Sequence, residues 1–559
     1  MHILPSWIHR LGQMQRVPHM RSFEAASRDP QAAQLERLQR IMRLSATTEF
    51  GRRHHLSEVR SLSDLQARVP VAGYSSFGPL IDREMAGERR VICAEKPMFY
   101  AISTGTTGAP KCVPLTPSVR REFQTPLLTS MAHVYRKYPQ AFKGTLFYFV
   151  ASARVRQTTD GTPIGFTSGF NFRRMPALVR SIYALPYEVA EAPNVRAKTY
   201  LIAWFAAMSP ITVIGAIYPL ALLELLRGVA TEGEALARDL RRGSLRDDLG
   251  LSAEQHSFFL RFARRDAALA DRIEAICRNE GGKLTGRALM PELKLVYAWT
   301  SASAGAYIPD LRAELPEGVA VEDAVYASNE GWSNVTLAEG NLGGPVSVLG
   351  HFYEFIEEKA WESGVREGIG AHEISPGKRY RIVLTTSAGL VRYDLGDTVE
   401  CTGMYNATPR IHFARRGGAS FNISGEHMDE VHIRDAVSAA LAETSWTAVF
   451  FTAVPRLHPT PRWEVLVELV EQPSERELRT FRTRIEMHLR QGNTDYGDRV
   501  GFTLRPLALR VLAQGAFHRH RVRLAEGGAP MEQTKVVHLY ADPIPFDAWQ
   551  QSCVIEAES

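Results

Sequence analysis

The chain has 559 residues, 45% of them hydrophobic and 23% charged, which excludes a disordered protein and indicates two or more globular domains. Lys and Arg number 66 against 61 Asp and Glu, and a net charge of +5 on so long a chain argues against a nucleic-acid-binding protein. The five cysteines include no CxxC pair, which argues against a zinc site and a disulfide framework. We expect a cytoplasmic protein, because the N-terminus lacks the apolar core of a signal peptide.

The first predicted element is a largely helical, amphipathic stretch from residue 31 to about residue 65. Its apolar residues Leu35, Leu38, Ile41 and Leu44 recur at helical spacing and are expected to pack. Strand-like runs then alternate with helical segments, which indicates α/β architecture. The strand candidates are residues 98–102, 144–150, 211–217, 294–299 and 379–385.

Residues 199–223 carry no charge and resemble a membrane span by hydropathy alone. Pro210 and Pro219 divide this stretch into short pieces, however. Residues 200–208 suit a buried helix, residues 211–217 suit a buried strand, and Pro219 is tolerated as the first residue of another helix. We therefore expect no membrane span.

Residues 415–424 read RRGGASFNIS, and the two adjacent glycines indicate a flexible joint. We expect a large N-terminal domain over residues 1–415, a hinge over residues 416–424 and a smaller, mobile α+β domain over residues 425–559. Two lobes joined in this way are typical of enzymes that close around a ligand.

The elements of the smaller domain follow from local patterns. Val465, Val467 and Leu469 alternate with Glu464 and Glu468, which is the period of a strand. A capping box of Ser474 and Glu477 begins a helix whose apolar residues lie on one face. The helix and strand candidates before and after it are residues 430–443, 447–454, 463–470 and 504–512.

The sharpest local signal is STGTTGAPK, which follows the strand candidate at residues 98–102. Its glycines allow a close backbone approach to phosphate, its hydroxyls donate hydrogen bonds, and Lys111 supplies a point charge. The spacing is neither that of the Walker loop nor GxGxxG, so a generic Ser/Thr/Gly turn remains the alternative. The loop residues that we expect to bind phosphate are Ser103, Thr104, Gly105, Thr106, Thr107, Gly108 and Lys111.

This loop resembles the phosphate loop of adenylate-forming acyl and aryl ligases. More specifically, the chain resembles the GH3 family of acyl acid amido synthetases over nearly its whole length. The segments that carry the resemblance, in the order of the family, are RVPVAGYSSFGPLIDREMAGE, VYASNEGW, LVRYDLGD, NTDYGDRV and QGAFHRHRVRLAEGGAPMEQTKV.

The resemblance implies roles for residues that the sequence alone would assign to structure. Tyr326 would lie against the adenine ring, and Asp397 would accept hydrogen bonds from both ribose hydroxyls. Glu330 would bind Mg²⁺, a cation that prefers carboxylate oxygen. Without the resemblance, Tyr326 is a core aromatic residue and Asp397 a turn residue at a strand end.

Two cations near the joint and the C-terminus also match positions of the family. Arg416 either approaches the phosphates or is a surface charge. Lys535, brought in by closure, would stabilise charge on the α-phosphate, the alternative being a solvated lysine. The chain departs from the family at Asn329, where Ser or Thr is usual but Asn can still donate to phosphate, and at His427, where many members have lysine. A neutral imidazole does not replace that charge, so the role of His427 is left open.

The acyl pocket is expected in residues 158–192, which help to line the acid site in the family. Arg173 and Arg174 either steer the carboxylate or are exposed, and we favour exposure. The residues expected to contact an aromatic or medium-sized apolar acid are Phe166, Phe170, Phe172, Met175 and Tyr183.

Together these features predict a cytoplasmic ligase that uses ATP and Mg²⁺, and the resemblance implies a monomer. It would adenylate a small carboxylic acid and pass the acyl group to an amine, most simply an amino acid, with Lys111, Lys535 and Arg416 as catalytic cations. The nucleotide motifs do not exclude another acceptor such as coenzyme A. A nucleotide-binding scaffold without catalysis is the other alternative. The identities of the acid, the amine and the general base do not follow from the sequence.

Overall fold

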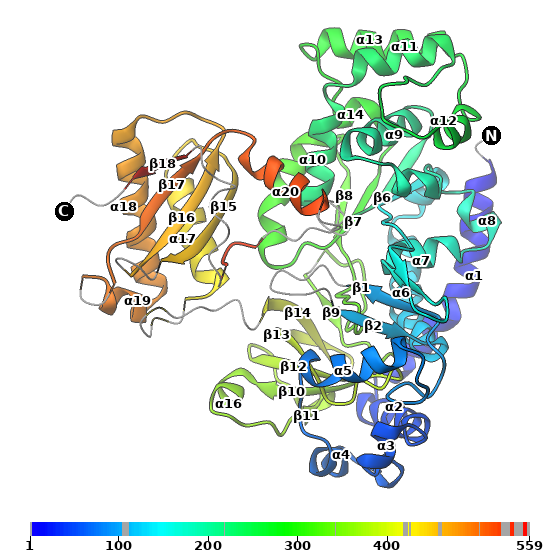
Figure 1. Ribbon diagram of the computed structural model, residues 1–559, viewed down its shortest axis with the longest axis vertical. Coiled ribbons are helices and arrows are strands. Elements are labelled where there is room, and N and C mark those ends of the chain that lie inside the picture. The colour runs from blue at the N-terminus through cyan, green and yellow to red at the C-terminus, as the bar shows by residue number, and fades with distance from the viewer. Residues whose placement is uncertain are drawn as a thin grey trace. The chain divides into compact units, whose positions relative to one another are not determined.

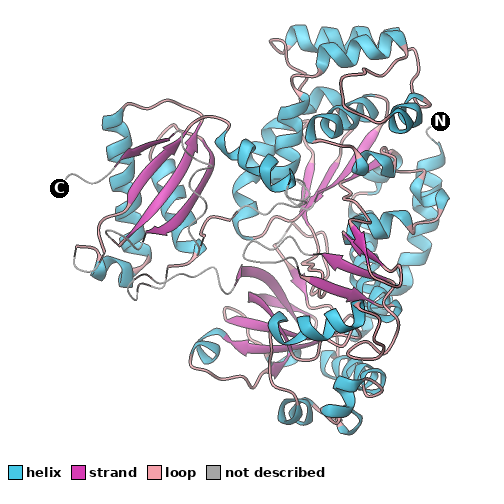
Figure 2. Cartoon of the chain, in the orientation of Figure 1, coloured by secondary structure: helices cyan, strands magenta, loops and turns pink. Residues whose placement is uncertain are grey.

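The computed structural model describes most of the chain as two compact units (Figure 1), one reaching Ala414 and the other starting at Arg415. Helices and strands are mixed throughout both units, as Figure 2 shows. The residues that it leaves undescribed are 1–2, 103–110, 217–218, 341, 417–422, 424–425, 427, 457–460, 502–503, 527–536, 541–551 and 556–559.

A four-stranded parallel sheet lies in the upper part of the first unit in Figure 1, in the order β3-β6-β7-β8. Its strands are rich in β-branched and aromatic residues, which fit a sheet that is buried on both faces. The helix α9 (Val195–Ala207) shares one hydrophobic core with this sheet, and its Tyr200 and Trp204 are both at most 1% exposed. The strand bounds are Thr145–Tyr148 for β3, Ile211–Ala216 for β6, Leu295–Ala298 for β7 and Ala320–Asp323 for β8.

A second sheet has the order β2-β1-β5-β4. Its strands β1 and β2 form a hairpin, and the segment between them, STGTTGAPK at residues 103–111, is called the hydroxyl-rich loop below. Strands β1 and β2 are antiparallel, and Ile102 lies opposite Cys112 at the end of the ladder. The loop at residues 103–111 therefore connects two paired strands, whereas a Walker loop connects a strand to a helix. The bounds are Phe99–Ile102 for β1, Cys112–Leu115 for β2, Arg156–Gln157 for β4 and Pro163–Gly165 for β5.

A third sheet of six strands has the order β11-β10-β12-β13-β14-β9. Strands β10, β12 and β13 pair antiparallel. The turn between β13 and β14 contains Asn406 at φ +52°, a left-handed conformation that Asn tolerates better than most residues. The bounds are Gly344–Pro345 for β9, Phe352–Glu357 for β10, Ile369–Gly370 for β11, Arg379–Thr385 for β12, Tyr393–Tyr405 for β13 and Thr408–Arg416 for β14.

Helices surround these sheets, and residues of the types that commonly begin helices stand at their starts. Thr116 caps α6 by accepting a hydrogen bond from the backbone N–H of Val119, and Pro219 is the first residue of α10. The helices of this unit are α1 (Ile3–Ala26), α2 (Pro30–Ser45), α3 (Glu49–Arg53), α4 (Leu62–Arg68), α5 (Tyr74–Met85), α6 (Pro117–Lys137), α7 (Thr167–Arg173), α8 (Ala177–Arg180), α9 (Val195–Ala207), α10 (Pro219–Val229), α11 (Gly233–Arg242), α12 (Ala253–Leu260), α13 (Ala267–Asn279), α14 (Gly286–Leu289), α15 (Ile308–Glu314) and α16 (Glu358–Glu362).

The second unit has one sheet in the order β15-β16-β17-β18 with helices packed against it. Strands β15 and β16 are antiparallel, and β16 and β17 are parallel. The predicted capping box of Ser474 and Glu477 is present at the start of α18. The bounds are α17 (Glu430–Ala442), β15 (Ala448–Arg456), β16 (Arg462–Leu469), α18 (Glu475–Gly492), α19 (Thr494–Arg499), β17 (Ala508–Leu512), α20 (Ala516–Glu526) and β18 (Ser552–Ile555).

The predicted α/β class and most of the predicted elements are confirmed, with differences of detail. The helical stretch after residue 31 consists of α2 followed by the shorter helices α3 and α4, and its Leu35 is 41% exposed instead of packed. The last predicted strand begins at Ala508 and not at residue 504. Residues 200–208 fall in the buried helix α9, as expected. Among the described residues, no helix combines the length and the apolar character needed to cross a membrane.

Candidate active site

Three aromatic side chains meet beyond the carboxyl ends of the parallel strands. Trp299 follows β7 and Tyr326 follows β8, while Phe413 lies on β14 of the six-stranded sheet. The ring centroids are 5.6 Å apart for Trp299 and Tyr326, 5.8 Å for Tyr326 and Phe413, and 5.6 Å for Trp299 and Phe413. Ligands of α/β proteins bind at this edge of a sheet, and Trp299 and Phe413 are only partly buried.

The hydroxyl of Tyr326 joins this aromatic group to Asp397 on β13. It donates a hydrogen bond of 2.6 Å to Oδ2 of Asp397, and both residues are 4% exposed. Asn334 fixes the backbone of the tyrosine, because its Oδ1 accepts from the N–H of Tyr326 at 2.7 Å. The structure thus brings together two residues to which the resemblance assigns the adenine and the ribose.

Glu330 lies in a tight turn close to this pair. The hydroxyl of Ser328 accepts hydrogen bonds from the N–H groups of Glu330 and Gly331, at 3.2 and 3.1 Å. Oε1 of Glu330 accepts a hydrogen bond of 3.1 Å from the hydroxyl of Tyr393. Glu330 is 4% exposed, so its carboxylate is held in one position by side-chain and backbone contacts.

Both ends of the hydroxyl-rich loop are anchored by side chains. At the first end, Nδ2 of Asn329 donates a hydrogen bond of 2.9 Å to the carbonyl of Ile102, and its Oδ1 accepts one of 3.0 Å from Thr167. At the second end, the hydroxyl of Tyr74 accepts from the N–H of Cys112 at 2.8 Å. Asn329 therefore has a structural role in positioning the loop, beside any donation to phosphate.

Lys111 is the one residue of the loop that the structure describes, and its side chain lies beside the ring of Tyr74. Its Nζ is 5.5 Å from the ring centroid of Tyr74, within the range of a cation–π contact. Burial raises the pKa of Tyr74, and Glu330 is among the carboxylates whose charge adds to this effect. A cation, an aromatic ring and a carboxylate thus share one small region beside the loop.

A buried ion pair supports the strand that carries Tyr393 and Asp397. Arg392 has φ +49°, and its guanidinium contacts Glu354 on β10 at 3.0 Å, with both side chains at most 3% exposed. The remaining donors of Arg392 reach the carbonyls of Val69 at 2.7 Å and Arg366 at 2.6 Å. Such a fully bonded guanidinium fixes the start of β13.

The residues expected to line the acyl pocket lie on and around α7. Phe166 precedes the helix, and Phe170 stacks on Phe99 with centroids 4.4 Å apart. Phe172 meets Tyr183 edge to face at 5.1 Å. Phe166, Phe170 and Phe172 are buried, Met175 and Tyr183 are partly buried, and Arg173 and Arg174 are exposed, as favoured from the sequence.

Several predicted site residues lie outside the described residues. These are the loop residues at 103–108, His427 and Lys535. Arg416 is the last residue of β14, and its side chain is not described. Their predicted roles stay predictions.

The donor set fits Mg²⁺ bound together with a nucleotide. Mg²⁺ in nucleotide sites takes one or two carboxylates and completes its shell with phosphate oxygens and water. Among the described residues no three His, Cys, Asp or Glu side chains cluster, whereas Glu330 is a single fixed carboxylate beside the loop. That arrangement suits a cation that arrives with ATP.

The aromatic partners of Tyr326 were not predicted from the sequence. Trp299 ends the strand predicted at residues 294–299, and the rule that ligands bind at the carboxyl ends of parallel strands is the signal that could have singled it out. No sequence rule points to Phe413 in this way, because its contact with Tyr326 depends on how the six-stranded sheet packs.

Aromatic and carboxylate side chains gather at this edge of the parallel sheet, and comparison with known proteins places this α/β protein further. The sequence matches the GH3 family N-terminal domain over residues 19–319, the central domain over residues 345–416 and the C-terminal domain over residues 431–544. The chain belongs to the GH3 family, which confirms the predicted resemblance.

Relatives within the family are named as amide-forming ligases. Indole-3-acetic acid-amido synthetase GH3.3 of Arabidopsis thaliana is 25% identical over 549 residues, covering 93% of this chain and 91% of the relative. Jasmonoyl--L-amino acid synthetase JAR6 of Nicotiana attenuata is 25% identical over 527 residues, covering 89% of each chain. These names bear out the predicted class of enzyme.

A solved structure shares the fold over nearly the whole chain. The AtGH3.15 acyl acid amido synthetase in complex with 2,4-DB aligns with a TM-score of 0.85 and 19% identity, covering 98% of this chain and 99% of that one. At this identity the likeness shows the fold, and it includes the smaller C-terminal unit.

Proposed function

We propose that this chain is an ATP-dependent acyl acid amido synthetase that joins a small carboxylic acid to an amino acid. The observation that carries the proposal is the hydrogen bond between Tyr326 and Asp397 beside the partly buried rings of Trp299 and Phe413. An aromatic surface next to a fixed carboxylate suits a nucleoside, because the rings stack on the base and the carboxylate accepts from ribose hydroxyls. Membership of the GH3 family supports the same conclusion.

The first step would activate the acid. One carboxylate oxygen attacks the α-phosphorus of ATP, the bond to the bridging oxygen breaks, and pyrophosphate leaves with the electron pair. The enzyme needs in-line positioning and cations for this step, and no covalent nucleophile. We assign the positioning of the phosphates to residues 103–108 and Lys111, with Asn329 holding the start of the loop. Mg²⁺ bound at Glu330 would neutralise charge on the phosphates.

The second step would form the amide. The neutral amine attacks the acyl carbon, the acyl–phosphate bond breaks, and AMP leaves while the amine loses a proton. We propose that residues 416–424 act as a hinge between domains over residues 1–415 and 425–559, and that closure brings Lys535 to the reacting groups. Arg416 would contribute a further positive charge near the phosphates.

The acid would bind beside α7. The side chains assigned to its pocket are aromatic or apolar, which suits an aromatic or medium-sized apolar acid over a small hydrophilic one. In this proposal Phe166, Phe172 and Met175 contact the acid directly, while Phe170, stacked on Phe99, supports them. We further propose that the enzyme is a cytoplasmic monomer.

A pyrophosphate-release screen across a panel of acids tests this function. Release that depends on both the acid and an added amino acid, with an amide found by mass spectrometry, is the expected result. A thioester formed with coenzyme A in place of the amide would instead favour the other class of ligase. Binding of ATP with no release for any acid in the panel would favour a scaffold without catalysis.

A further inference from the structure

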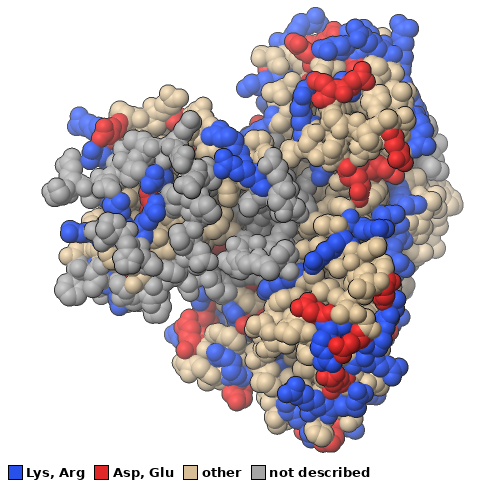
Figure 3. Space-filling view, in the orientation of Figure 1, with Lys and Arg blue, Asp and Glu red and all other residues tan. Residues whose placement is uncertain are grey.

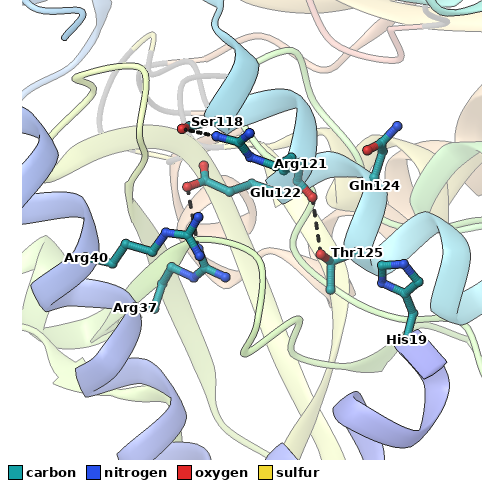
Figure 4. A pocket seen from close by; sticks show the side chains of 8 residues that line it. All are labelled: His19, Arg37, Arg40, Ser118, Arg121, Glu122, Gln124 and Thr125. Atoms are coloured by element: carbon teal, nitrogen blue, oxygen red, sulfur yellow. Dashed lines mark hydrogen bonds and ion pairs between the residues drawn. The ribbon is translucent and has the colours of Figure 1, made fainter. Parts of the chain in front are cut away.

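A cavity of about 390 Å³ lies among helices α1, α2 and α6 of the first unit (Figure 4). Its volume lies within the range of about 300–1,000 Å³ that is typical of small-molecule sites. None of its lining residues belongs to the candidate active site. The lining residues that matter here are His19, Arg37, Arg40, Ser118, Arg121 and Glu122.

The cavity carries more positive than negative charge. Arg37, Arg40 and Arg121 line it, and Glu122 is the one carboxylate among the lining residues. Arg40 has no ion-pair partner among the described residues. Arg121 is 60% exposed and approaches Glu95 only at 3.7 Å, so this pair screens little of its charge. Figure 3 shows both basic and acidic side chains over the described surface on the face that it draws.

Glu122 offsets only part of this positive charge, because it is a single carboxylate beside three guanidinium groups. Its Oε1 accepts from the hydroxyl of Ser387, and its Oε2 lies 2.9 Å from Nδ1 of His351. Arg37 reaches it only at 3.9 Å. Burial lowers the pKa of Arg37, the charge of Glu122 opposes this effect, and Arg40 nearby adds a smaller lowering. The three arginines and the one carboxylate that line the cavity thus leave it with a net positive charge.

We propose that this cavity binds a small oxyanion, that is, the phosphate or carboxylate group of a small molecule. Guanidinium groups bind both groups in a bidentate manner, and Arg40 and Arg121 come from two different helices, so they can hold one anion from two sides. Ser118 adds a hydroxyl donor at the same wall, because its oxygen accepts from the guanidinium of Arg121 at 2.9 Å and its hydrogen can point to the anion. The anion would balance the charge that Glu122 leaves on the arginines.

The contacts of Glu122 also connect this cavity, through packed side chains, with the candidate active site. The ring of His351 lies against Gly331, where an added Cβ would come within 3.1 Å of it. Phe123, the next residue on α6, stacks on Trp332 with centroids 5.6 Å apart. Gly331 and Trp332 follow Glu330 directly, so a shift of Glu122 reaches the turn that holds that carboxylate.

Thermal unfolding of the full chain, titrated with inorganic phosphate and separately with succinate at constant ionic strength, tests the proposal. A ligand that binds the folded state raises the Tm as its concentration rises. We expect at least one anion to do so, and we expect the double variant R40Q/R121Q to weaken its apparent binding by about tenfold or more. Both arginines are exposed, so the variant is expected to fold.

Two further variants decide where the anion binds. R43Q removes an exposed charge from the same helix α2 but outside the cavity, and it should bind the anion like the wild type. K111A should also bind normally, because Lys111 belongs to the phosphate loop. Equal anion binding by R40Q/R121Q and the wild type, loss of binding in K111A alone, or no Tm rise with either anion would overturn the proposal.

Discussion

The phenol of Tyr326 donates a hydrogen bond of 2.6 Å to the carboxylate of Asp397, across 71 residues of sequence. The contact joins two motifs that the family resemblance assigns to different parts of a nucleotide. It orients the carboxylate and holds the tyrosine ring against Trp299 and Phe413. In the proposed site, the base-stacking role of Tyr326 and the ribose-binding role of Asp397 therefore depend on one another, and substitution of one residue should disturb the position of the other.

The first prediction concerns this hydrogen bond. Tyr326→Phe keeps the ring but removes the donor, and a buried carboxylate that loses a partner costs about 1–3 kcal/mol. We expect the KM for ATP to rise about tenfold, with a smaller effect on kcat, in the pyrophosphate-release assay. Asp397→Ala should abolish release. An unchanged KM in Tyr326→Phe would show that the bond does not position the nucleotide.

The second prediction concerns Lys111 at the end of the phosphate loop. If its ammonium stabilises charge on the phosphates in the transition state, Lys111→Ala should lower kcat by about 10²- to 10³-fold. The side chain is only partly buried and stacks on Tyr74, so the Tm should change by no more than a few degrees. Near-normal turnover of the variant, measured with the acid that the wild type prefers, would remove Lys111 from the site.

The third prediction concerns the ion pair of Arg392 and Glu354. Glu354→Gln leaves a buried guanidinium without its counter-charge, and breaking such a pair costs about 3–5 kcal/mol in the free energy of unfolding. The pair of Arg379 and Glu400 is a matched control, because it joins strands of the same sheet at 3.1 Å but is 47% and 30% exposed. Glu400→Gln should cost less than about 1 kcal/mol. Denaturant unfolding of both variants compares them, and equal losses would contradict the argument.

Much of the fold follows from local sequence patterns, and the exceptions have a common cause. The helix that begins at Pro219 and the capping box at Ser474 depend on neighbours a few residues away, and both were predictable. Glu464 and Glu468 lie on a correctly predicted strand, yet they are only 1% and 3% exposed. No local pattern shows this, because their partners come from elsewhere in the chain. Glu464 pairs with Arg510 from β17, and Glu468 accepts from the N–H of Gly515.

The residues of the candidate site likewise divide into those that the sequence predicted and those that it did not. Glu330 and Asp397 were found because they lie in recognisable motifs. Trp299 and Phe413 were not found, since each reaches the site from a strand other than those of the motifs, and Tyr393 was not singled out although it lies in the motif LVRYDLGD. Motifs therefore identify which residues take part, while the packing of the two sheets determines which side chains touch.

The last prediction concerns His538, which follows the segment that contains Lys535. Nδ1 of this histidine contacts the carbonyl of Phe451 at 2.7 Å, and its backbone carbonyl accepts from the N–H of Ala453 on β15 at 2.9 Å. The side chain is 0% exposed, and its Nε2 has no hydrogen-bond partner among the described residues. Burial lowers the pKa of His538 to about 4 from an ordinary value of 6.5.

The sign of the pH dependence follows from this shift. The unfolded or detached segment binds a proton below about pH 6.5, whereas the docked histidine resists protonation until about pH 4. Docking is therefore fully stable above pH 6.5 and weakens as the pH falls, by about 2 kcal/mol at pH 5. Hydrogen exchange at the Ala453 amide, corrected for intrinsic rates, should show protection falling between pH 7 and pH 5. In His538→Phe, which fills the space beside Phe451 without titrating, protection should change far less over that range, and a parallel fall in both proteins would exclude His538 as the cause.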